Sequence, residues 1–325
     1  MLRADTVKDL EEQFVSTLLE HLSDQILKQS LPIRLSKIAP KLQIQSRPQF
    51  INGFHDGELR FDAAKQKFII NLCNPESAVQ ERSLRRQRFT YAHEMAHRFF
   101  FVPDENQGWT RAIDLTTAAV TPDSKLQTRR RLNDIEEPLC NRIAQRVLMP
   151  DDLLSSRCKL RDWFDGEQNF YESLSGTAKD FGISRECLIV GMGDAIKRKV
   201  LKFDAGWSWC LFILNRSKGL ISRRGKEALR ISVNIFPREV DGQLIRAPYP
   251  YCEVRYLGRE AEEFFGKAFV QPQPSGGRVD LTLSLTLIKP KGVGVSGQLL
   301  GWWRSYGMGT NEFRRICVWG LLRLS

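Results

Sequence analysis

The sequence predicts an α+β protein in two parts, a mostly helical domain over residues 1–196 and a β-rich α+β domain over residues 197–325. In the first part apolar residues recur at helical spacing. From Gly206 onward they alternate with polar residues between Gly, Pro and Ser turns. The charge changes at the same place, because residues 1–196 carry 27 Lys and Arg against 28 Asp and Glu, whereas residues 197–325 carry 22 against 10.

The first elements follow from local spacing. Apolar residues at helical intervals predict a helix from Thr6 to about Lys28 and a short one near Leu35–Leu42. Gly57–Asp62 and Lys67–Leu72 alternate between apolar and polar residues, which predicts a hairpin joined by Ala63–Gln66. We expect this small sheet to lie beside the next helix, where an edge strand can hold an extended peptide by backbone pairing.

The next helix, expected over residues 80–101, carries the five-residue motif His93-Glu-Met-Ala-His97. Residues four apart share a helix face, so both imidazoles can bind one metal ion while Glu94 stands beside the ion's open position. The chain has only four histidines, and half of them lie in this motif. The motif therefore predicts metal-assisted hydrolysis with Glu94 as the general base.

A catalytic zinc site of this kind needs three protein ligands and an open position for water. No histidine follows His97, so the third ligand is expected to be a carboxylate or a thiolate. Proline is tolerated in the first turn of a helix, so Pro138 predicts that the next helix begins at Glu136 or Glu137. Either carboxylate can be the ligand, and Asn141 shares a helix face with Glu137, from which it can hold a ligand imidazole.

The remaining elements are expected from caps and alternation. Pro150 ends the helix that contains Asn141. Two more helices are expected over about 168–181 and 184–199, separated by Gly182 as a C-cap and Ser184 as an N-cap. In the second part, strands are expected over residues 208–214, 229–236, 251–257 and 279–289, with a short helix near 260–268.

Two segments together resemble the paired signature of the ImmA/IrrE metallopeptidases. They are Arg88-Phe-Thr-Tyr-Ala-His-Glu-Met-Ala-His97 and Glu137-Pro-Leu-Cys-Asn-Arg-Ile-Ala-Gln-Arg-Val-Leu-Met-Pro150. The resemblance covers roughly residues 30–196 and implies a zincin-like domain that binds one Zn²⁺. It implies that His93, His97 and Glu137 are the zinc ligands and that Glu94 is the general base. Ile143 and Val147 replace the family's Phe and Leu, and Pro138 follows the third ligand directly, but none of these departures removes a metal-binding atom.

The resemblance also implies a regulatory function. Residues of about 168–196 are similar to the helix-turn-helix-like element that follows the peptidase helices in this family, and we favour the interpretation that this pair of helices only packs against the first domain. Members of the family typically cleave a helix-turn-helix repressor and so release a stress, mobile-element or defence operon. The overall plan resembles the CapP-like branch, which regulates CBASS-type anti-phage operons. That likeness implies a C-terminal sensor activated by single-stranded DNA.

The excess positive charge of residues 197–325 favours an anionic partner such as nucleic acid, although a basic surface can also serve solubility alone. The candidate contacts lie in two expected loops. They are Arg223, Arg224 and Lys226 in one and Arg314 and Arg315 in the other.

A regulated protease needs a latch, meaning a part of the chain that blocks the active site until a signal arrives, and the sequence offers two candidates. One is Cys73, whose thiolate could fill the open position of the zinc, with a buried or idle thiol as the alternative. The other is the C-terminal domain, which could block the cleft until it binds its ligand. The sequence does not choose between them.

The main alternative to a protease is a non-proteolytic DNA-binding transcriptional regulator that keeps its zinc site, and a third is a toxin–antitoxin partner that acts by protein contact. Glu94 favours the enzyme, because a purely structural zinc needs no base. No apolar stretch approaches the ~20 residues that span a bilayer, and no secretory signal is evident, so we expect a cytoplasmic protein without a membrane partner. Oligomeric state and the choice among zinc, manganese and iron stay open.

Overall fold

The computed structural model describes most of the chain. The described residues are 12–13, 15–20, 22, 30–51, 57–73, 81–105, 108–111, 122–158, 169–201, 208–221, 227–235, 238–240, 243–245, 251–270, 276–287, 294–308 and 313–324.

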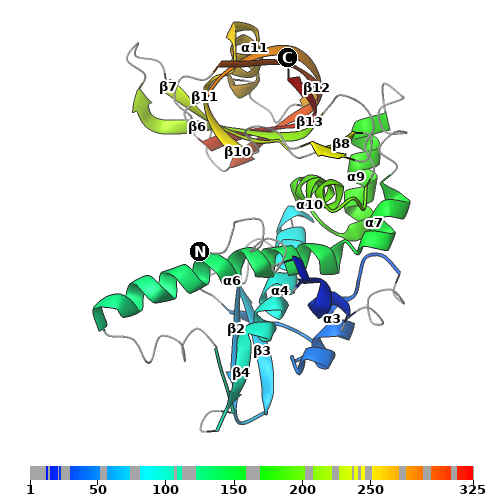
Figure 1. Cartoon of the computed structure of the whole chain (residues 1–325), viewed down its shortest axis with the longest axis vertical. Coiled ribbons are helices and arrows are strands. Elements are labelled where there is room, and N and C mark those ends of the chain that lie inside the picture. The colour runs from blue at the N-terminus through cyan, green and yellow to red at the C-terminus, as the bar shows by residue number, and fades with distance from the viewer. Residues whose placement is uncertain are drawn as a thin grey trace. The chain divides into compact units, whose positions relative to one another are not determined.

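The structure is mixed α+β, as predicted (Figure 1). The chain divides into two compact units, residues 1–157 with 174–188, and residues 158–173 with 189–325. The predicted boundary between residues 196 and 197 stays a prediction. No helix in the described ranges is long and apolar enough to cross a membrane.

A three-stranded sheet forms the base of the first unit. Its order is β1 (Gln49–Ile51), β3 (Lys67–Cys73), β2 (Gly57–Asp62), with β3 parallel to β1 and antiparallel to β2. The β2–β3 hairpin confirms the predicted one, and it turns through Gln66 at a φ of 51°. The central strand, β3, is buried from residue 68 to residue 72, whereas β2 lies at one edge of the sheet.

Helix α4 (Glu81–His97) packs against β2 and β3 and carries the His-Glu-Met-Ala-His motif in its last turns. The helix was predicted to reach residue 101. Instead it tightens into a 3₁₀ turn, η2 (Arg98–Phe100), and the chain leaves as strand β4 (Phe101–Asp104). Strand β4 pairs antiparallel with β5 (Gly108–Arg111). Because Arg111 at the end of β5 pairs with Phe101 at the start of β4, the end of β5 lies beside the end of the motif helix.

Arg98 fixes the end of the motif helix to its surroundings. Its guanidinium lies 4.4 Å from the ring centroid of Phe68 and 3.9 Å from that of Trp109. It also donates hydrogen bonds to the carbonyl oxygen of Leu42 and to Oε1 of Gln43. Because Arg98 directly follows the second motif histidine, these contacts limit how that histidine can move.

Helix α6 spans Pro122–Leu148, so the prediction that Pro138 marks its first turn is wrong. A proline inside a helix costs about 3 kcal/mol, because it lacks one N–H and its ring crowds the carbonyl four residues earlier. That carbonyl belongs to Asp134, an exposed residue where water can act as the missing donor. Beyond the proline, α6 packs against α4, and Cys140, Ile143 and Ala144 are buried.

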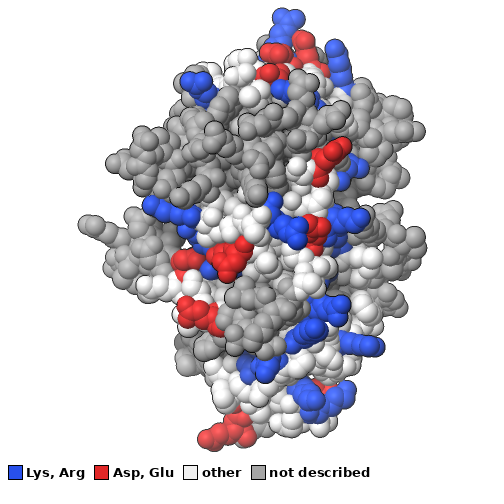
Figure 2. Space-filling view, turned by 90° about the vertical axis from the view of Figure 1, so that its right-hand side faces the viewer, with Lys and Arg blue, Asp and Glu red and all other residues white. Residues whose placement is uncertain are grey.

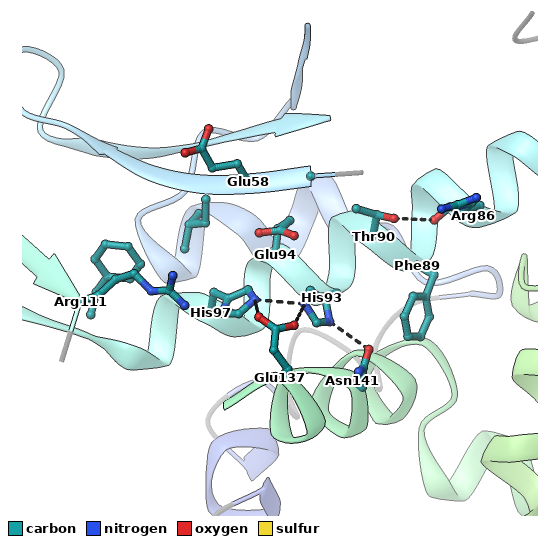
Figure 3. Close-up of a pocket in the computed structure, with 13 residues that line it drawn as sticks. Glu58, Arg86, Phe89, Thr90, His93, Glu94, His97, Arg111, Glu137 and Asn141 are labelled. Carbon is teal, nitrogen blue, oxygen red and sulfur yellow. Dashed lines mark hydrogen bonds and ion pairs between the residues drawn. The ribbon is translucent and has the colours of Figure 1, made fainter. Parts of the chain in front are cut away.

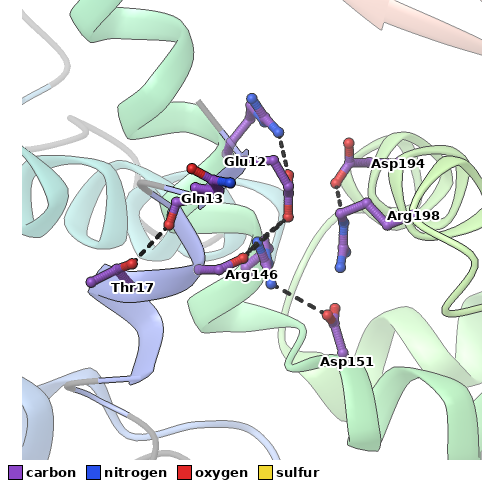
Figure 4. A network of polar contacts seen from close by, with 9 residues as sticks. Glu12, Gln13, Thr17, Arg146, Asp151, Asp194 and Arg198 are labelled. Atoms are coloured by element: carbon purple, nitrogen blue, oxygen red, sulfur yellow. Dashed lines mark hydrogen bonds and ion pairs between the residues drawn. The ribbon is translucent and has the colours of Figure 1, made fainter. Parts of the chain in front are cut away.

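The N-terminal segment is tied to α6 by ion pairs (Figure 4). Residues 12–13 and 15–20 are helical, and the rest of the predicted helix from Thr6 to Lys28 lies mostly outside the described residues. Glu12 accepts hydrogen bonds from Arg142 at 2.5 Å and from Arg146 at 2.6 Å. Arg146 also reaches Asp151 at 3.4 Å, at the start of α7 (Asp151–Arg157).

The predicted pair of helices is confirmed with its caps. Helix α9 (Asn169–Phe181) ends at Gly182, whose φ of 66° is the left-handed conformation that favours glycine. Helix α10 (Arg185–Lys197) begins after Ser184, whose Oγ accepts a hydrogen bond from the backbone N–H of Cys187 at 3.1 Å.

The second unit contains a closed antiparallel barrel in the order β10-β11-β12-β13-β6-β7. Helix α11 (Arg259–Val270) packs against β11 and β13, and its Ala261, Phe265 and Ala268 join the barrel core. The barrel strands are β6 (Ser208–Ile221), β7 (Glu227–Ile235), β10 (Tyr251–Tyr256), β11 (Gly276–Leu287), β12 (Gly294–Met308) and β13 (Phe313–Leu324), and a small separate hairpin is formed by β8 (Arg238–Val240) and β9 (Gln243–Ile245).

Strands β12 and β13 were not predicted, because glycines interrupt the alternation that marks a strand. Gly301 and Gly320 are directly opposite each other in the ladder. A Cβ on Gly301 would lie 2.2 Å from the carbonyl oxygen of Trp319, and one on Gly320 would lie 2.1 Å from that of Leu300. The two strands therefore approach so closely at this point that only glycine fits.

Candidate metal centre

Helices α4 and α6 and the edge strand β2 surround a cavity of about 640 Å³. Figure 3 shows the motif histidines on α4 facing Glu137 and Asn141 on α6, with β2 passing beside Glu94. The lining residues are Gly57, Glu58, Leu59, Arg86, Phe89, Thr90, His93, Glu94, His97, Phe101, Arg111, Glu137 and Asn141.

Three side chains converge on one point in this cavity. The Nε2 atoms of His93 and His97 are 3.0 Å apart, and the Glu137 carboxylate lies 3.2 Å from the first and 3.5 Å from the second. Ligand atoms bound tetrahedrally at ~2.0–2.1 Å from one zinc are about 3.4 Å apart, so these separations fit a single ion. Glu137 is half-exposed toward the cavity, and the structure brings the three sequence-predicted ligands together.

The other ring nitrogen of each histidine has its own partner. His93 Nδ1 lies 3.1 Å from Asn141 Oδ1, as expected, and His97 Nδ1 lies 2.6 Å from Glu136 Oε1. When Nδ1–H donates to these oxygens, Nε2 keeps its lone pair for a metal. Burial, and then the charge of His97, lower the pKa of His93, which favours the neutral form that binds metal.

Glu136 was considered only as an alternative ligand, so sequence reasoning missed its position. The signal was present, because neighbouring helix residues point about 100° apart and cannot both face the same ion. With Glu137 directed at the Nε2 atoms, Glu136 is left to face the buried side of His97. The two adjacent carboxylates therefore contact the same imidazole at different nitrogens.

His97, Glu136 and Cys140 are a second buried group with metal-ligand side chains. Arg111 Nη2 lies 2.5 Å from Glu136 Oε1, so a positive charge already neutralises this carboxylate. Burial raises the pKa of the Cys140 thiol, whose sulfur lies 3.4 Å from His97 Nδ1, and this disfavours the thiolate that a metal needs. Hydrogen bonding to His97 explains this group better than a metal does.

Glu94 is buried beside the convergent nitrogens. Burial raises the pKa of Glu94 to about 7, with a further rise from the charge of Glu137, against lowering by His97, Arg111 and a backbone hydrogen bond from Leu59. A carboxylate with a pKa near neutral pH is suited to take a proton and release it again.

Gly57 allows β2 to approach α4 this closely. A Cβ on Gly57 would lie 2.6 Å from Thr90 Cγ2 and 2.9 Å from Glu94 Cγ, both too short for carbon atoms that do not bond. Among the described strands β2 pairs only with β3, so its other edge faces the cavity at Gly57, Glu58 and Leu59. This edge is the expected position for an extended peptide.

None of the remaining sequence candidates is among the described residues that line this cavity. Cys73 is at the end of β3 and is not among the described residues that line the cavity, and the thiolate latch stays a prediction. Arg314 and Arg315 lie in β13 rather than in a loop, opposite Gly307 and Tyr306. Arg223, Arg224 and Lys226 lie outside the described residues.

The face in Figure 2 shows no uniform basic surface among the coloured side chains. Described Lys and Arg are interspersed there with Asp and Glu. A nucleic-acid contact therefore stays a prediction from the charge of residues 197–325.

Comparison of the chain with protein-family models, with curated proteins and with solved structures gives no match. The resemblance to ImmA/IrrE metallopeptidases therefore depends on the two sequence motifs alone.

Proposed function

We propose that the chain is a zinc-dependent endopeptidase with a zincin-like centre, in which His93, His97 and Glu137 bind the metal and Glu94 is the general base. The observation that carries this proposal is the convergence of two imidazole Nε2 atoms and one carboxylate at separations of 3.0, 3.2 and 3.5 Å. The two Nδ1 partners support it, because each fixes its histidine with Nε2 toward the cavity. Manganese or iron would also accept this ligand set.

The bound ion would lower the pKa of a water molecule and polarise a peptide carbonyl. Glu94 accepts a proton from this water while the water oxygen attacks the carbonyl carbon, and the π electron pair of the carbonyl moves to the carbonyl oxygen. When the C–N bond breaks, that pair forms C=O again and Glu94 returns the proton to the leaving nitrogen. The products are a carboxylic acid, which ionises, and an amine.

The proposed substrate is a helix-turn-helix repressor of a stress or anti-phage operon, on the basis of the motif resemblance. The edge of β2 offers backbone pairing to a segment that is extended, so the segment cleaved is expected to be a linker rather than a helix. Activation by single-stranded DNA through the basic C-terminal part belongs to the same proposal. The latch in which the C-terminal domain blocks the cleft stays a prediction.

A non-proteolytic DNA-binding regulator is the second candidate, and the positive charge of residues 197–325 is the observation that favours it. It does not explain why Glu94 is buried next to the convergent ligand atoms. A structural metal site has no use for a carboxylate with a pKa of about 7 at that position.

Mixing the full-length chain with the repressor encoded beside it, with and without single-stranded DNA, tests the proposal. Glu94→Gln is expected to bind zinc but to lose cleavage, and His97→Ala to lose both. Glu172→Gln is the matched control, because Glu172 is an exposed residue of α9 that does not line the cavity. Cleavage by Glu94→Gln at the wild-type rate would exclude the mechanism, and no fragment under any nucleic-acid condition would favour the second candidate.

A further inference from the structure

Arg111 neutralises Glu136 and also lines the cavity that the proposed metal ligands face. It is the last residue of β5, where it pairs with Phe101, four residues beyond His97. Figure 3 shows its guanidinium pointing from β5 toward His97. The fold therefore holds a positive charge beside the proposed ligands.

This guanidinium is held in a fixed place. Its Nη2 donates to Glu136 Oε1 at 2.5 Å, and the same oxygen lies 2.6 Å from His97 Nδ1. Glu136 is buried, and the Arg111 side chain is 30% exposed. One carboxylate oxygen thus sets the position of Arg111 relative to a proposed metal ligand.

Arg111 also has N–H groups left for a further acceptor. A guanidinium carries five N–H groups, and the described contacts use one of them, in the hydrogen bond to Glu136. The Nε of Arg111 is buried, so the donors open to a ligand are on its two Nη atoms, and the side chain is 30% exposed where it lines the cavity. An acceptor that enters the cavity can therefore meet these donors.

We infer that Arg111 is a catalytic residue that donates hydrogen bonds to the carbonyl oxygen of the scissile peptide as negative charge develops on it. The inference depends on the proposed function. When water adds to the carbonyl carbon, an electron pair moves to the carbonyl oxygen, and the fixed guanidinium of Arg111 stabilises this negative charge. The pair forms C=O again when the C–N bond breaks. Donors fixed in advance are effective here, because they need not reorganise during the reaction.

Small probes test this role without a substrate. The full-length chain is loaded with Co²⁺, and binding of methylphosphonate, a tetrahedral anion, is followed by the visible spectrum of the metal. Imidazole serves as a neutral probe that binds metal but offers no oxyanion. The variants are Arg111→Gln, Arg111→Lys and Arg60→Gln. Arg60 is an exposed arginine of β2 that does not line the cavity, so its variant controls for the loss of one charge.

Arg111→Gln is expected to weaken methylphosphonate binding at least about tenfold, the effect of losing a charged hydrogen bond. Its affinity for imidazole and for Co²⁺, measured by chelator competition, should stay within about threefold. Arg111→Lys should recover part of the phosphonate affinity, because it keeps the charge but not the fork of donors. Arg60→Gln should match the wild type.

Equal weakening of both probes would overturn the inference, because Arg111 would then only hold Glu136 and His97 in place. Unchanged methylphosphonate binding in Arg111→Gln would overturn it as well. Neither result concerns metal binding by the wild-type chain, so the proposed function would stand. Failure of the wild-type chain to bind Co²⁺ or Zn²⁺ would instead refute the proposed function, and this inference with it.

Discussion

Replacing Gly57 by alanine tests how closely β2 lies against α4, the helix that carries the proposed base. The new Cβ would stand 2.6 Å from Thr90 Cγ2, 2.9 Å from Glu94 Cγ and 3.1 Å from Glu94 Oε1. Non-bonded carbon atoms prefer about 3.5–4.0 Å, so the strand or the Glu94 side chain must move by roughly 1 Å. A displacement of ~1 Å at a catalytic group costs about 100-fold in rate, and overpacking costs about 1–3 kcal/mol in stability.

The assay compares repressor cleavage, zinc affinity and thermal unfolding of Gly57→Ala with the wild type. We expect cleavage to fall about 100-fold while zinc affinity changes little, because the atoms nearest to the new Cβ belong to Thr90 and Glu94 rather than to a proposed ligand. Adding Thr90→Ser to Gly57→Ala removes the closest methyl group and should recover stability more than cleavage.

Gly176→Ala is the matched control, since Gly176 lies within α9 and a Cβ there has no neighbour within 4 Å. It should stabilise the protein by about 0.5–1 kcal/mol and leave cleavage unchanged. Wild-type cleavage and an unchanged melting temperature in Gly57→Ala would refute the close packing of β2 on Glu94.

Three further variants test other contacts. Glu136→Ala should lower zinc affinity about 10–100-fold in chelator competition, because His97 loses its Nδ1 partner; unchanged affinity would show that Glu136 does not orient this ligand. Gly320→Ala should prevent β12 and β13 from pairing beside Leu300 and unfold the barrel at lower denaturant, and an unchanged urea midpoint would contradict the close approach. In the metal-free protein, Glu94→Gln should be more stable than the wild type by up to about 3 kcal/mol, and this difference should grow as pH rises from about 4.5 to 7. The reason is that the pKa of Glu94 is raised, so its ionisation costs more free energy in the folded state than in the unfolded state. Urea unfolding at pH 4.5 and pH 8 checks the sign, and a stabilisation confined to the lower pH would contradict it.

Local signals predicted the elements that depend on local chemistry. The hairpin of β2 and β3 and the boundary between α9 and α10 follow from alternation and from caps that act within a few residues. Pro138 was misleading, because the packing of α6 against α4 outweighs the local preference of proline for a first turn. Strands β12 and β13 were not predicted, because the reason for their glycines is the close approach of the opposite strand, which only the folded structure shows.

The same division holds for the site. The sequence by itself determined that His93 and His97 share a helix face with Glu94 beside them, because spacing on one helix fixes which side chains share a face. It also narrowed the proposed third ligand to Glu136 or Glu137. Only the tertiary structure directed Glu137 to the Nε2 atoms and Glu136 to the Nδ1 of His97, since that choice depends on how α4 and α6 pack. Arg111 reaches the cavity from a separate strand, and contacts between segments distant in sequence have no local signal.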